Sequence, residues 1–339
     1  MLRFSLLLIL GIVTLWTMFS SCFSSTAELS AAVLAPADEF TKQLRGEEKV
    51  LDMRQFERKE LDIPYTTDMH NPRQTLDIIY PTNAKAPFKI IMLLHGGAWA
   101  MTNKRSESIA SIYEAINQGY AIVAVNYRLS NEVKWPYPLY DIKAAVRFIR
   151  ANAKHYELDA SKIVLWGVSS GGHLAQMMAA TNGNTKFEDL SMGNAKTSSE
   201  VQGIVSWYGI SDISRLSDIG TNPANILMGY NVRLNANKTK EANPIAWVNK
   251  KFPPILLVHG SEDGIVPIEQ AIDMQNKVNQ ITKKHHALLE ILDGGIHGDS
   301  IIKSKDNVLS NLFFVDKILY PKGENPYRSH RTLTIKLKE

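Results

Sequence analysis

Apolar, strand-like runs alternate along this chain with stretches in which apolar side chains recur at helical spacing. Eight strand-like runs stand at Glu60–Tyr65, Thr75–Tyr80, Lys89–Leu94, Ala121–Val125, Lys162–Trp166, Gln202–Trp207, Pro254–Val258 and Ala287–Leu292. Helical periodicity is clearest over Asp141–Asn152, Ile268–Val278 and Val308–Leu319. Such alternation indicates a mostly parallel sheet with helices on both faces. We therefore predict an α/β fold of about eight strands, with the first two paired as an antiparallel hairpin at one edge.

Two stretches interrupt the alternation, at residues 181–200 and about 213–250, and both are rich in Asn, Ser and Lys. We interpret them as excursions from the sheet, and the second is long enough to form a small lid over its carboxyl edge. A chain of 339 residues can bury one large core or two modest ones. One domain over residues 51–325 is the simplest interpretation, with a spacer over 28–50 before it and a tail over 326–339 after it.

Residues 1–27 have the order of an export signal. A positive start with Arg3 precedes the apolar run Phe4–Phe19, and small and polar residues follow. The run is marginal in length for a membrane span. Cys22, the only cysteine, resembles the lipidated cysteine of bacterial lipoprotein signals, although Phe19 stands where that pattern has an aliphatic residue. We expect an exported protein, either a periplasmic or cell-surface lipoprotein tethered to a membrane through Cys22 or a secreted protein cleaved after Ala27.

The charge pattern argues against a nucleic-acid partner. The formal net charge is +4, and lysines and arginines interleave with acidic residues except in the cationic tail at 336–338. Nucleic-acid binding requires a clustered basic face, which this pattern does not provide. No cluster of His, Cys, Asp or Glu has the spacing of a zinc or calcium site, so we expect no metal cofactor.

A sharp turn is predicted directly after the strand-like run Lys162–Trp166. It carries Gly167-Val168-Ser169-Ser170-Gly171-Gly172 and leads into a helix of small residues that reaches Ala180. This is the G-x-S-x-G pattern in its strand–turn–helix setting, where the serine is held exposed and larger flanking residues would collide. The helix N-terminus favours negative charge beside the serine. We interpret Ser169 as a catalytic nucleophile, the Ser170 N–H as a donor to an oxyanion, and His173 as a packing residue.

Backbone donors on the other side of the substrate carbonyl are expected after Lys89–Leu94. There the chain reads His95-Gly96-Gly97-Ala98-Trp99, and adjacent glycines let two peptide N–H groups turn towards one point. We expect Gly96 and Gly97 (or Ala98) to complete the oxyanion hole, and His95 to brace the loop. Five residues are expected to line the substrate pocket: Trp99, Trp207, Tyr208, Val266 and Ile296.

A serine nucleophile needs a base, and the base needs a carboxylate that orients it. Asp263 follows the run Pro254–Val258, and His297 stands between glycines after Ala287–Leu292. Both fall at the carboxyl ends of consecutive strands, on the same edge of the sheet as Ser169. Their chain order of Ser, acid, His is that of the α/β hydrolases. The rival acid is Glu262, and the rival bases are His259, His285 and His286.

Together these stretches resemble the esterase branch related to hormone-sensitive lipase and the carboxylesterases, and most of all its BD-FAE group of feruloyl and acetyl-xylan esterases. The resemblance runs from about Tyr80 to Leu319 and is carried by His95–Trp99, Asn126–Leu129, Pro138 with Asp141, Trp166–Leu174, Trp207–Gly209 with Asp212, His259–Pro267 and Gly294–Gly298. It departs from the HGG-type signature where Ala98 replaces a third glycine. The match of Gly260–Pro267 to the family's G-x-x-D-x-x-V-P loop favours Asp263 over Glu262.

The resemblance implies an α/β-hydrolase fold and hydrolysis of carboxylic esters through an acyl-enzyme. The expected substrates are short acyl or carbohydrate-linked esters, such as acetyl or feruloyl groups on small molecules or polysaccharides. Two alternatives stay open. One is hydrolysis of an amide or peptide bond, as in formamidase-like or prolyl-peptidase-like relatives, and the other is a non-catalytic lipoprotein that uses the fold for binding.

Overall fold

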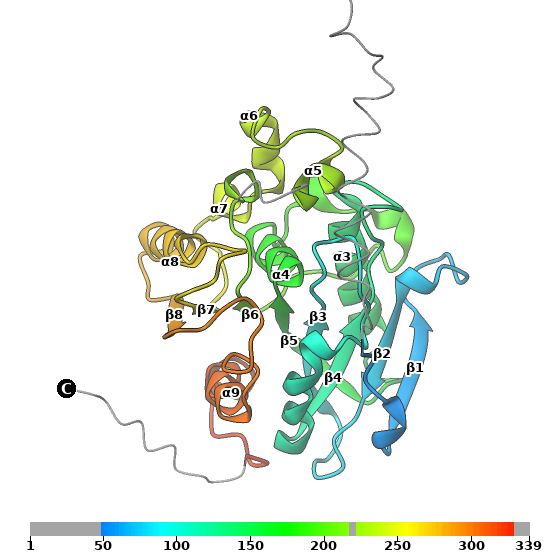
Figure 1. The fold of residues 1–339 in the computed structure, drawn as a ribbon. Coiled ribbons are helices and arrows are strands. Elements are labelled where there is room, and N and C mark those ends of the chain that lie inside the picture. Colours follow the sequence, from blue (N-terminus) through cyan, green and yellow to red (C-terminus); the bar gives the residue numbers. More distant parts are fainter. Residues whose placement is uncertain (1–48, 217–221, 329–339) are drawn as a thin grey trace, which may run out of the picture. The chain divides into compact units, whose positions relative to one another are not determined.

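The computed structural model describes residues 49–216 and 222–328, which belong to one folding unit. The predicted export signal with Cys22, the spacer up to residue 48 and the tail from residue 329 lie outside the described residues. An eight-stranded sheet with the order β1-β2-β4-β3-β5-β6-β7-β8 forms the centre of this unit (Figure 1). The α/β-hydrolase fold expected from the sequence is therefore confirmed.

The eight strands match the eight apolar runs of the sequence. They are β1 (Lys59–Pro64), β2 (Thr75–Ile79), β3 (Phe88–Leu94), β4 (Tyr120–Val125), β5 (Leu158–Val168), β6 (Gly203–Trp207), β7 (Ile255–Gly260) and β8 (Ala287–Leu292). β2 is antiparallel to both β1 and β4, and the pairs from β4 through β3 to β8 are parallel. β5 begins four residues before the predicted Lys162, because Leu158 and Asp159 pair with the start of β3.

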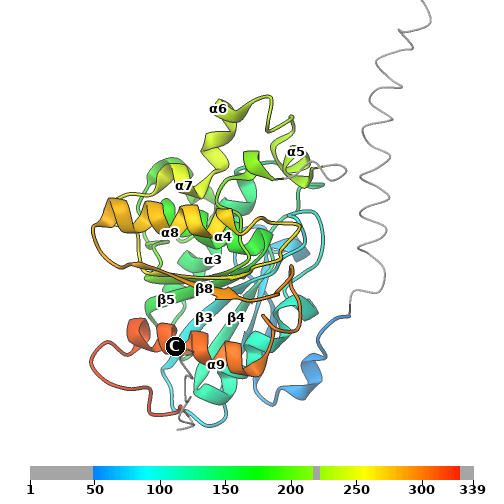
Figure 2. The same cartoon turned by 60° about the vertical axis from the view of Figure 1, so that its left-hand side comes forward.

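Helices cover both faces of the sheet (Figure 2). One face carries α3 (Tyr137–Ala151), α4 (Ser170–Ala180) and α8 (Glu269–Thr282), and the other carries the 3₁₀ helix η3 (Glu107–Gln118) and α9 (Lys305–Leu319). Alternate side chains of each strand enter the two apolar cores. Ile90 and Met92 of β3 belong to the core with α3, α4 and α8, whereas Ile91 and Leu93 belong to the core with η3 and α9.

Where the structure describes them, the two predicted excursions contain short helical segments. The first holds η4 (Thr185–Phe187) and η5 (Leu190–Met192), and Arg147 of α3 fixes it by donating to the Gly193 and Asp189 carbonyls. The second holds η6 (Ile213–Arg215), α5 (Pro223–Met228), α6 (Ala236–Thr239), η7 (Lys240–Ala242) and α7 (Pro244–Trp247). It lies on the α4 side of the sheet, where the Ala242 carbonyl accepts from His173 Nε2 at 2.7 Å. Its role as a lid stays a prediction.

Two further helical turns complete the description, η1 (Met53–Gln55) before β1 and η2 (Pro72–Gln74) before β2. Asp52 caps η1 by accepting from the Arg54 N–H, and Asn71 caps η2 in the same way with the Arg73 N–H. Among the helices of the described ranges, none combines the length and the apolar character that crossing a bilayer requires.

Candidate active site

Ser169 lies in the tight turn that joins β5 to α4. Its backbone has φ 53° and ψ −119°, a strained conformation for a residue other than glycine. The flanking glycines are required by close backbone approach. A Cβ at Gly167 would lie under 3.0 Å from the Gly171 carbonyl, and one at Gly171 would lie equally close to the Leu94 carbonyl. The turn is therefore as tight as the G-x-S-x-G pattern predicts, since any side chain at either glycine would clash with backbone atoms. It brings the start of α4 into backbone contact with the end of β3.

The structure brings Ser169, His297 and Asp263 together from three separate loops. Ser169 Oγ lies 3.0 Å from His297 Nε2, and His297 Nδ1 lies 2.8 Å from Asp263 Oδ2. Because the carboxylate can only accept, Nδ1 carries the proton and donates it. Nε2 is then free to accept from the Ser169 hydroxyl. A neutral imidazole in this tautomer is oriented to take the serine proton.

Both oxygens of Asp263 are fully engaged in a buried position. Oδ1 accepts from the backbone N–H groups of Ile265 and Val266, each at 2.9 Å. Oδ2 accepts from His297 and also lies 3.3 Å from His259 Nε2. Burial alone would raise the pKa of Asp263, but the hydrogen bonds from the two histidines and the Val266 N–H lower it overall. The rival acid Glu262 is exposed, so the carboxylate beside His297 is that of Asp263.

His259, considered as a rival base, lies buried behind the acid. Its Nε2 is 2.8 Å from the Val266 carbonyl, which can only accept, so Nε2 donates and is shared with Asp263 Oδ2. Its contact with the acid is not among the sequence expectations, although the four-residue spacing from His259 to Asp263 across a tight loop could have indicated it. Of the remaining rivals, His285 is exposed and His286 contacts the Phe252 carbonyl.

The loop after β3 runs directly beside the nucleophile. Gly97, Ala98 and Trp99 all have positive φ, at 102°, 52° and 60°. A Cβ at Gly96 would lie 3.3 Å from Ser169 Cβ. Within the residues that the structure describes, the N–H groups of all four expected donors, Gly96, Gly97, Ala98 and Ser170, donate to no protein acceptor. Ser170 is the first residue of α4, where an N–H lacks an intrahelical partner. These donors are available to an anion formed next to Ser169.

Tyr127 and Thr102 hold the loop after β3 in place. Tyr127 donates its hydroxyl to the His95 carbonyl at 2.9 Å and stacks on the His95 ring at 4.3 Å. Thr102 donates to the Gly96 carbonyl at 2.8 Å. Burial lowers the pKa of His95 to about 3, so the ring is neutral at ordinary pH. His95 is therefore a brace, as expected, and its one N–H is used within the loop, where Nδ1 donates to the Gly96 carbonyl.

Of the five residues expected to line the substrate pocket, some lie beside the triad and others are buried in the core. Tyr208 places its ring edge-on to His297 at 4.6 Å, and Ile296 is exposed next to His297 in the chain. Val266 is buried beside Asp263, and Trp99 is buried where its indole donates to His173 at 3.2 Å. The expectation for Trp207 is wrong: its indole lies in the core under α9 and donates to Asn311 at 2.7 Å.

His173 is a packing residue, as expected. Its Nε2 donates to Ala242, its Nδ1 accepts from Trp99, and burial lowers its pKa to about 4. The remaining groups form a hydroxyl, a base, an orienting acid and a set of N–H donors, which together suit acyl transfer. Over residues 49–216 and 222–328 no set of three or more His, Cys, Asp or Glu side chains is placed to hold a metal ion.

The chain is similar to known proteins over most of this unit. The BD-FAE family model matches residues 76–278, a stretch that contains Ser169 and Asp263. The probable carboxylic ester hydrolase LipM of Mycobacterium tuberculosis is 28% identical over 201 residues, which make up 58% of this chain and 46% of LipM. Esterase LipC of the same organism is 26% identical over 242 residues, or 68% of this chain and 58% of LipC. The chain spans about half the length of the curated relatives it matches.

A solved structure described as a truncated form of carbohydrate esterase from gut microbiota is also similar, with a TM-score of 0.74 and 28% identity. The superposition covers 80% of this chain and 100% of that one. The eight-stranded order and the turn at Ser169 thus occur within a fold shared with that esterase. Since the family model matches more than half of the sequence and spans β2 to α8, the chain belongs to the BD-FAE family.

Proposed function

We propose that this protein hydrolyses carboxylic esters, with Ser169 as nucleophile, His297 as base and Asp263 as orienting acid. The observation that carries the proposal is the continuous pair of hydrogen bonds from Ser169 Oγ to His297 Nε2 and from His297 Nδ1 to Asp263 Oδ2, at 3.0 and 2.8 Å. The names of the relatives, which are ester hydrolases and esterases, support ester cleavage over amide cleavage.

The first half of the reaction forms an acyl-enzyme. Ser169 Oγ attacks the ester carbonyl carbon while its proton passes to His297 Nε2, and the carbonyl oxygen becomes an anion. The N–H groups of Gly97, Ala98 and Ser170 donate to that oxyanion. The C–O bond to the alcohol then breaks, and His297 gives its proton to the departing alcohol oxygen.

Water completes the reaction in the second half. His297 Nε2 takes a proton from water, the resulting oxygen attacks the acyl carbon, and the same N–H groups hold the second oxyanion. The bond to Ser169 Oγ then breaks, and His297 returns a proton to that oxygen as the acid leaves. The low pKa of Asp263 keeps its carboxylate ionised throughout, so it stabilises the imidazolium in both halves.

The substrate proposed is an acetyl or feruloyl ester on a carbohydrate. The family assignment and the similarity to a carbohydrate esterase support this class. Two large apolar side chains, Ile265 and Ile296, are 61% and 53% exposed and flank the Asp263 and His297 loops. An apolar rim of this kind suits a planar aromatic acyl group better than it suits a charged one.

The test is hydrolysis of p-nitrophenyl acetate, followed by release of acetate from acetylated xylan and of ferulate from feruloylated arabinoxylan. We expect Ser169→Ala to lower kcat by roughly 10⁴-fold or more. Ser310→Ala on α9, which changes the same side chain away from the site, is expected to keep the wild-type rate. Equal rates in wild type and Ser169→Ala would contradict the proposal, and faster turnover of a peptide or formamide than of any ester would redirect it to amides.

A further inference from the structure

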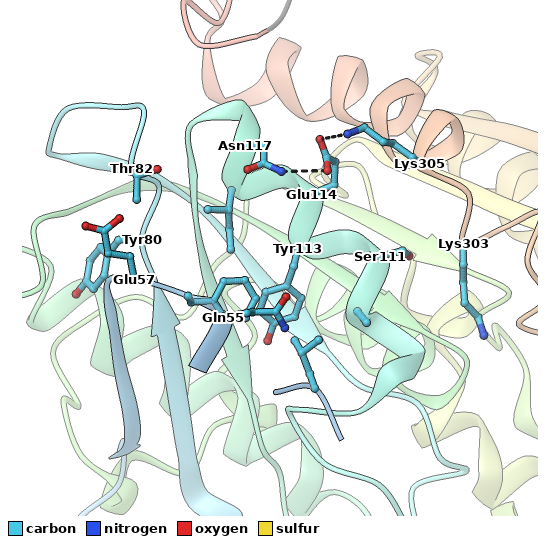
Figure 3. A pocket seen from close by; sticks show the side chains of 14 residues that line it. Gln55, Glu57, Tyr80, Thr82, Ser111, Tyr113, Glu114, Asn117, Lys303 and Lys305 are labelled. Atoms are coloured by element: carbon cyan, nitrogen blue, oxygen red, sulfur yellow. Dashed lines mark hydrogen bonds and ion pairs between the residues drawn. The ribbon is translucent and has the colours of Figure 1, made fainter. Parts of the chain in front are cut away.

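A cleft on the η3–α9 face of the sheet has no part in the chemistry described above (Figure 3). It has a volume of about 570 Å³, within the range typical of small-molecule sites. Its walls come from η1 and the residues after it, the end of β2, one side of η3 and the segment that leads into α9. The residues that line the cleft do not include Ser169, Asp263 or His297, although Lys303 lies on the same β8–α9 segment as His297.

One wall of the cleft is held in place by a chain of polar contacts. Lys305 Nζ lies 2.9 Å from Glu114 Oε1, and Asn117 Nδ2 donates to Glu114 Oε2 at 3.1 Å. Asn83 fixes the backbone behind them by donating to the Asn117 carbonyl at 2.8 Å. The carboxylate and the amide are thus oriented before any ligand arrives, and such preorganisation lowers the entropy lost on binding.

Other polar groups of the cleft have capacity left for a ligand. In the part of the chain that the structure describes, the charged ends of Glu57 and Lys303 have no ionic or hydrogen-bonded partner, and the Ser111 hydroxyl is buried without one. Figure 3 shows Glu57 and Lys303 at opposite sides of the cleft. A buried hydroxyl without a partner gains most from a ligand that can both donate and accept.

The chemistry of the lining favours a neutral ligand rich in hydroxyl groups. Two acids, Glu57 and Glu114, balance two lysines, so the cleft has no net charge that would select a polyanion or a polycation. Carboxylates and amides supply acceptors and donors in pairs, as adjacent sugar hydroxyls require. The ring of Phe56, stacked on Tyr113 at 5.2 Å, adds an apolar surface of the kind on which the carbon face of a sugar packs.

We propose that this cleft binds a segment of a neutral glycan chain, apart from the residue whose ester is cleaved. The identity of this ligand rests on the proposed function, since an ester linked to a carbohydrate is attached to a glycan chain. Lys303 follows His297 by six residues, and six residues span at most about 20 Å. A chain of several sugars held in the cleft could therefore extend to the edge of the sheet at which Ser169 lies.

The experiment is native electrophoresis of the full chain through gels that contain soluble arabinoxylan, with heparin gels as the polyanion arm. The test variant is Gln55→Ala with Asn117→Ala, two exposed amides of the cleft. The matched control is Asn276→Ala with Gln280→Ala, two exposed amides on α8, across the sheet. We expect arabinoxylan to retard wild type and control equally. The test variant should bind about tenfold more weakly, as the loss of two neutral hydrogen-bonding groups implies.

All three proteins should hydrolyse p-nitrophenyl acetate at the same rate, which also reports that the variants are folded. Equal retardation of the test variant and wild type would overturn the glycan cleft, as would retardation by heparin alone. Ester hydrolysis by a wild type that arabinoxylan does not retard would also overturn the cleft and leave the proposed function intact. If arabinoxylan retards wild type more than the test variant but wild type hydrolyses no ester, the glycan cleft is supported and the proposed function is contradicted.

Discussion

Acid should destabilise this fold in part because two buried histidines are held neutral. Burial lowers the pKa of His95 to about 3 and that of His173 to about 4. In each ring one nitrogen already donates to a carbonyl. The other nitrogen cannot use a second proton, since His173 Nδ1 accepts from Trp99 and His95 Nε2 has no partner among the described residues.

The size of the effect follows from linkage. In the unfolded chain both rings titrate near 6.5. Because folding lowers the pKa, the stability is intact above pH 6.5 and is lost as the pH falls towards the folded-state values. At about pH 4.5, two units below the unfolded value, each histidine costs about 2.7 kcal/mol and the two together about 5 kcal/mol. That loss equals the lower end of the total stability of a typical domain, roughly 5–15 kcal/mol.

The assay is urea unfolding followed by tryptophan fluorescence, at about pH 7.5 and about pH 4.5, for wild type and His173→Gln. We expect the loss of stability between the two pH values to be smaller in the variant by about 2.7 kcal/mol, the contribution of one histidine, since glutamine does not titrate. Comparing the two proteins cancels groups that they share, such as Glu290, whose pKa burial raises. The same pH dependence in both proteins would refute the reasoning.

Four more outcomes follow from the site and the N-terminal sequence. Gly171→Ala should abolish esterase activity and lower the unfolding midpoint, because its Cβ would lie under 3.0 Å from the Leu94 carbonyl; wild-type values would contradict this. Asp263→Asn should lower kcat by roughly 10⁴-fold at an unchanged circular dichroism spectrum, and a small loss would argue against its orienting role. His259→Phe removes a donor from that carboxylate, so kcat should fall while KM stays unchanged; an unchanged kcat would leave His259 only a packing role. We propose that Cys22 is lipidated, so Cys22→Ser should lose labelled palmitate in cells, and no label in wild type would favour simple secretion.

Much of the sheet could be predicted from the sequence because its signals are local. The parallel strands β3 to β7 are mostly buried on both faces and therefore read as continuous apolar runs, which is why the sequence predicts their positions within a few residues. The turn at Ser169 was predictable for a similar reason, since two glycines in a strand–turn–helix setting leave few alternatives. Asp263 and His297 followed from the rule that parallel strands end at one edge.

Features that depend on packing between distant segments could not be predicted from the sequence. Trp207 and Val205 share one face of β6, but the pattern alone does not say whether that face looks towards α4 or α9. The extension of β5 to Leu158 depends on its pairing with β3, which no local pattern records. The sharing of Asp263 between two histidines likewise arises only when β7 and β8 lie side by side.

The close fit of Gly171 against the end of β3 has a consequence for the resting protein. Because the start of α4 and the loop after Leu94 touch backbone to backbone, neither can shift without the other. The backbone around Ser169 should therefore keep the same geometry when a ligand binds. Compounds that imitate the tetrahedral intermediate, such as boronic acids, should therefore find the site preorganised. We expect them to bind in a single step, with no slow isomerisation before tight binding.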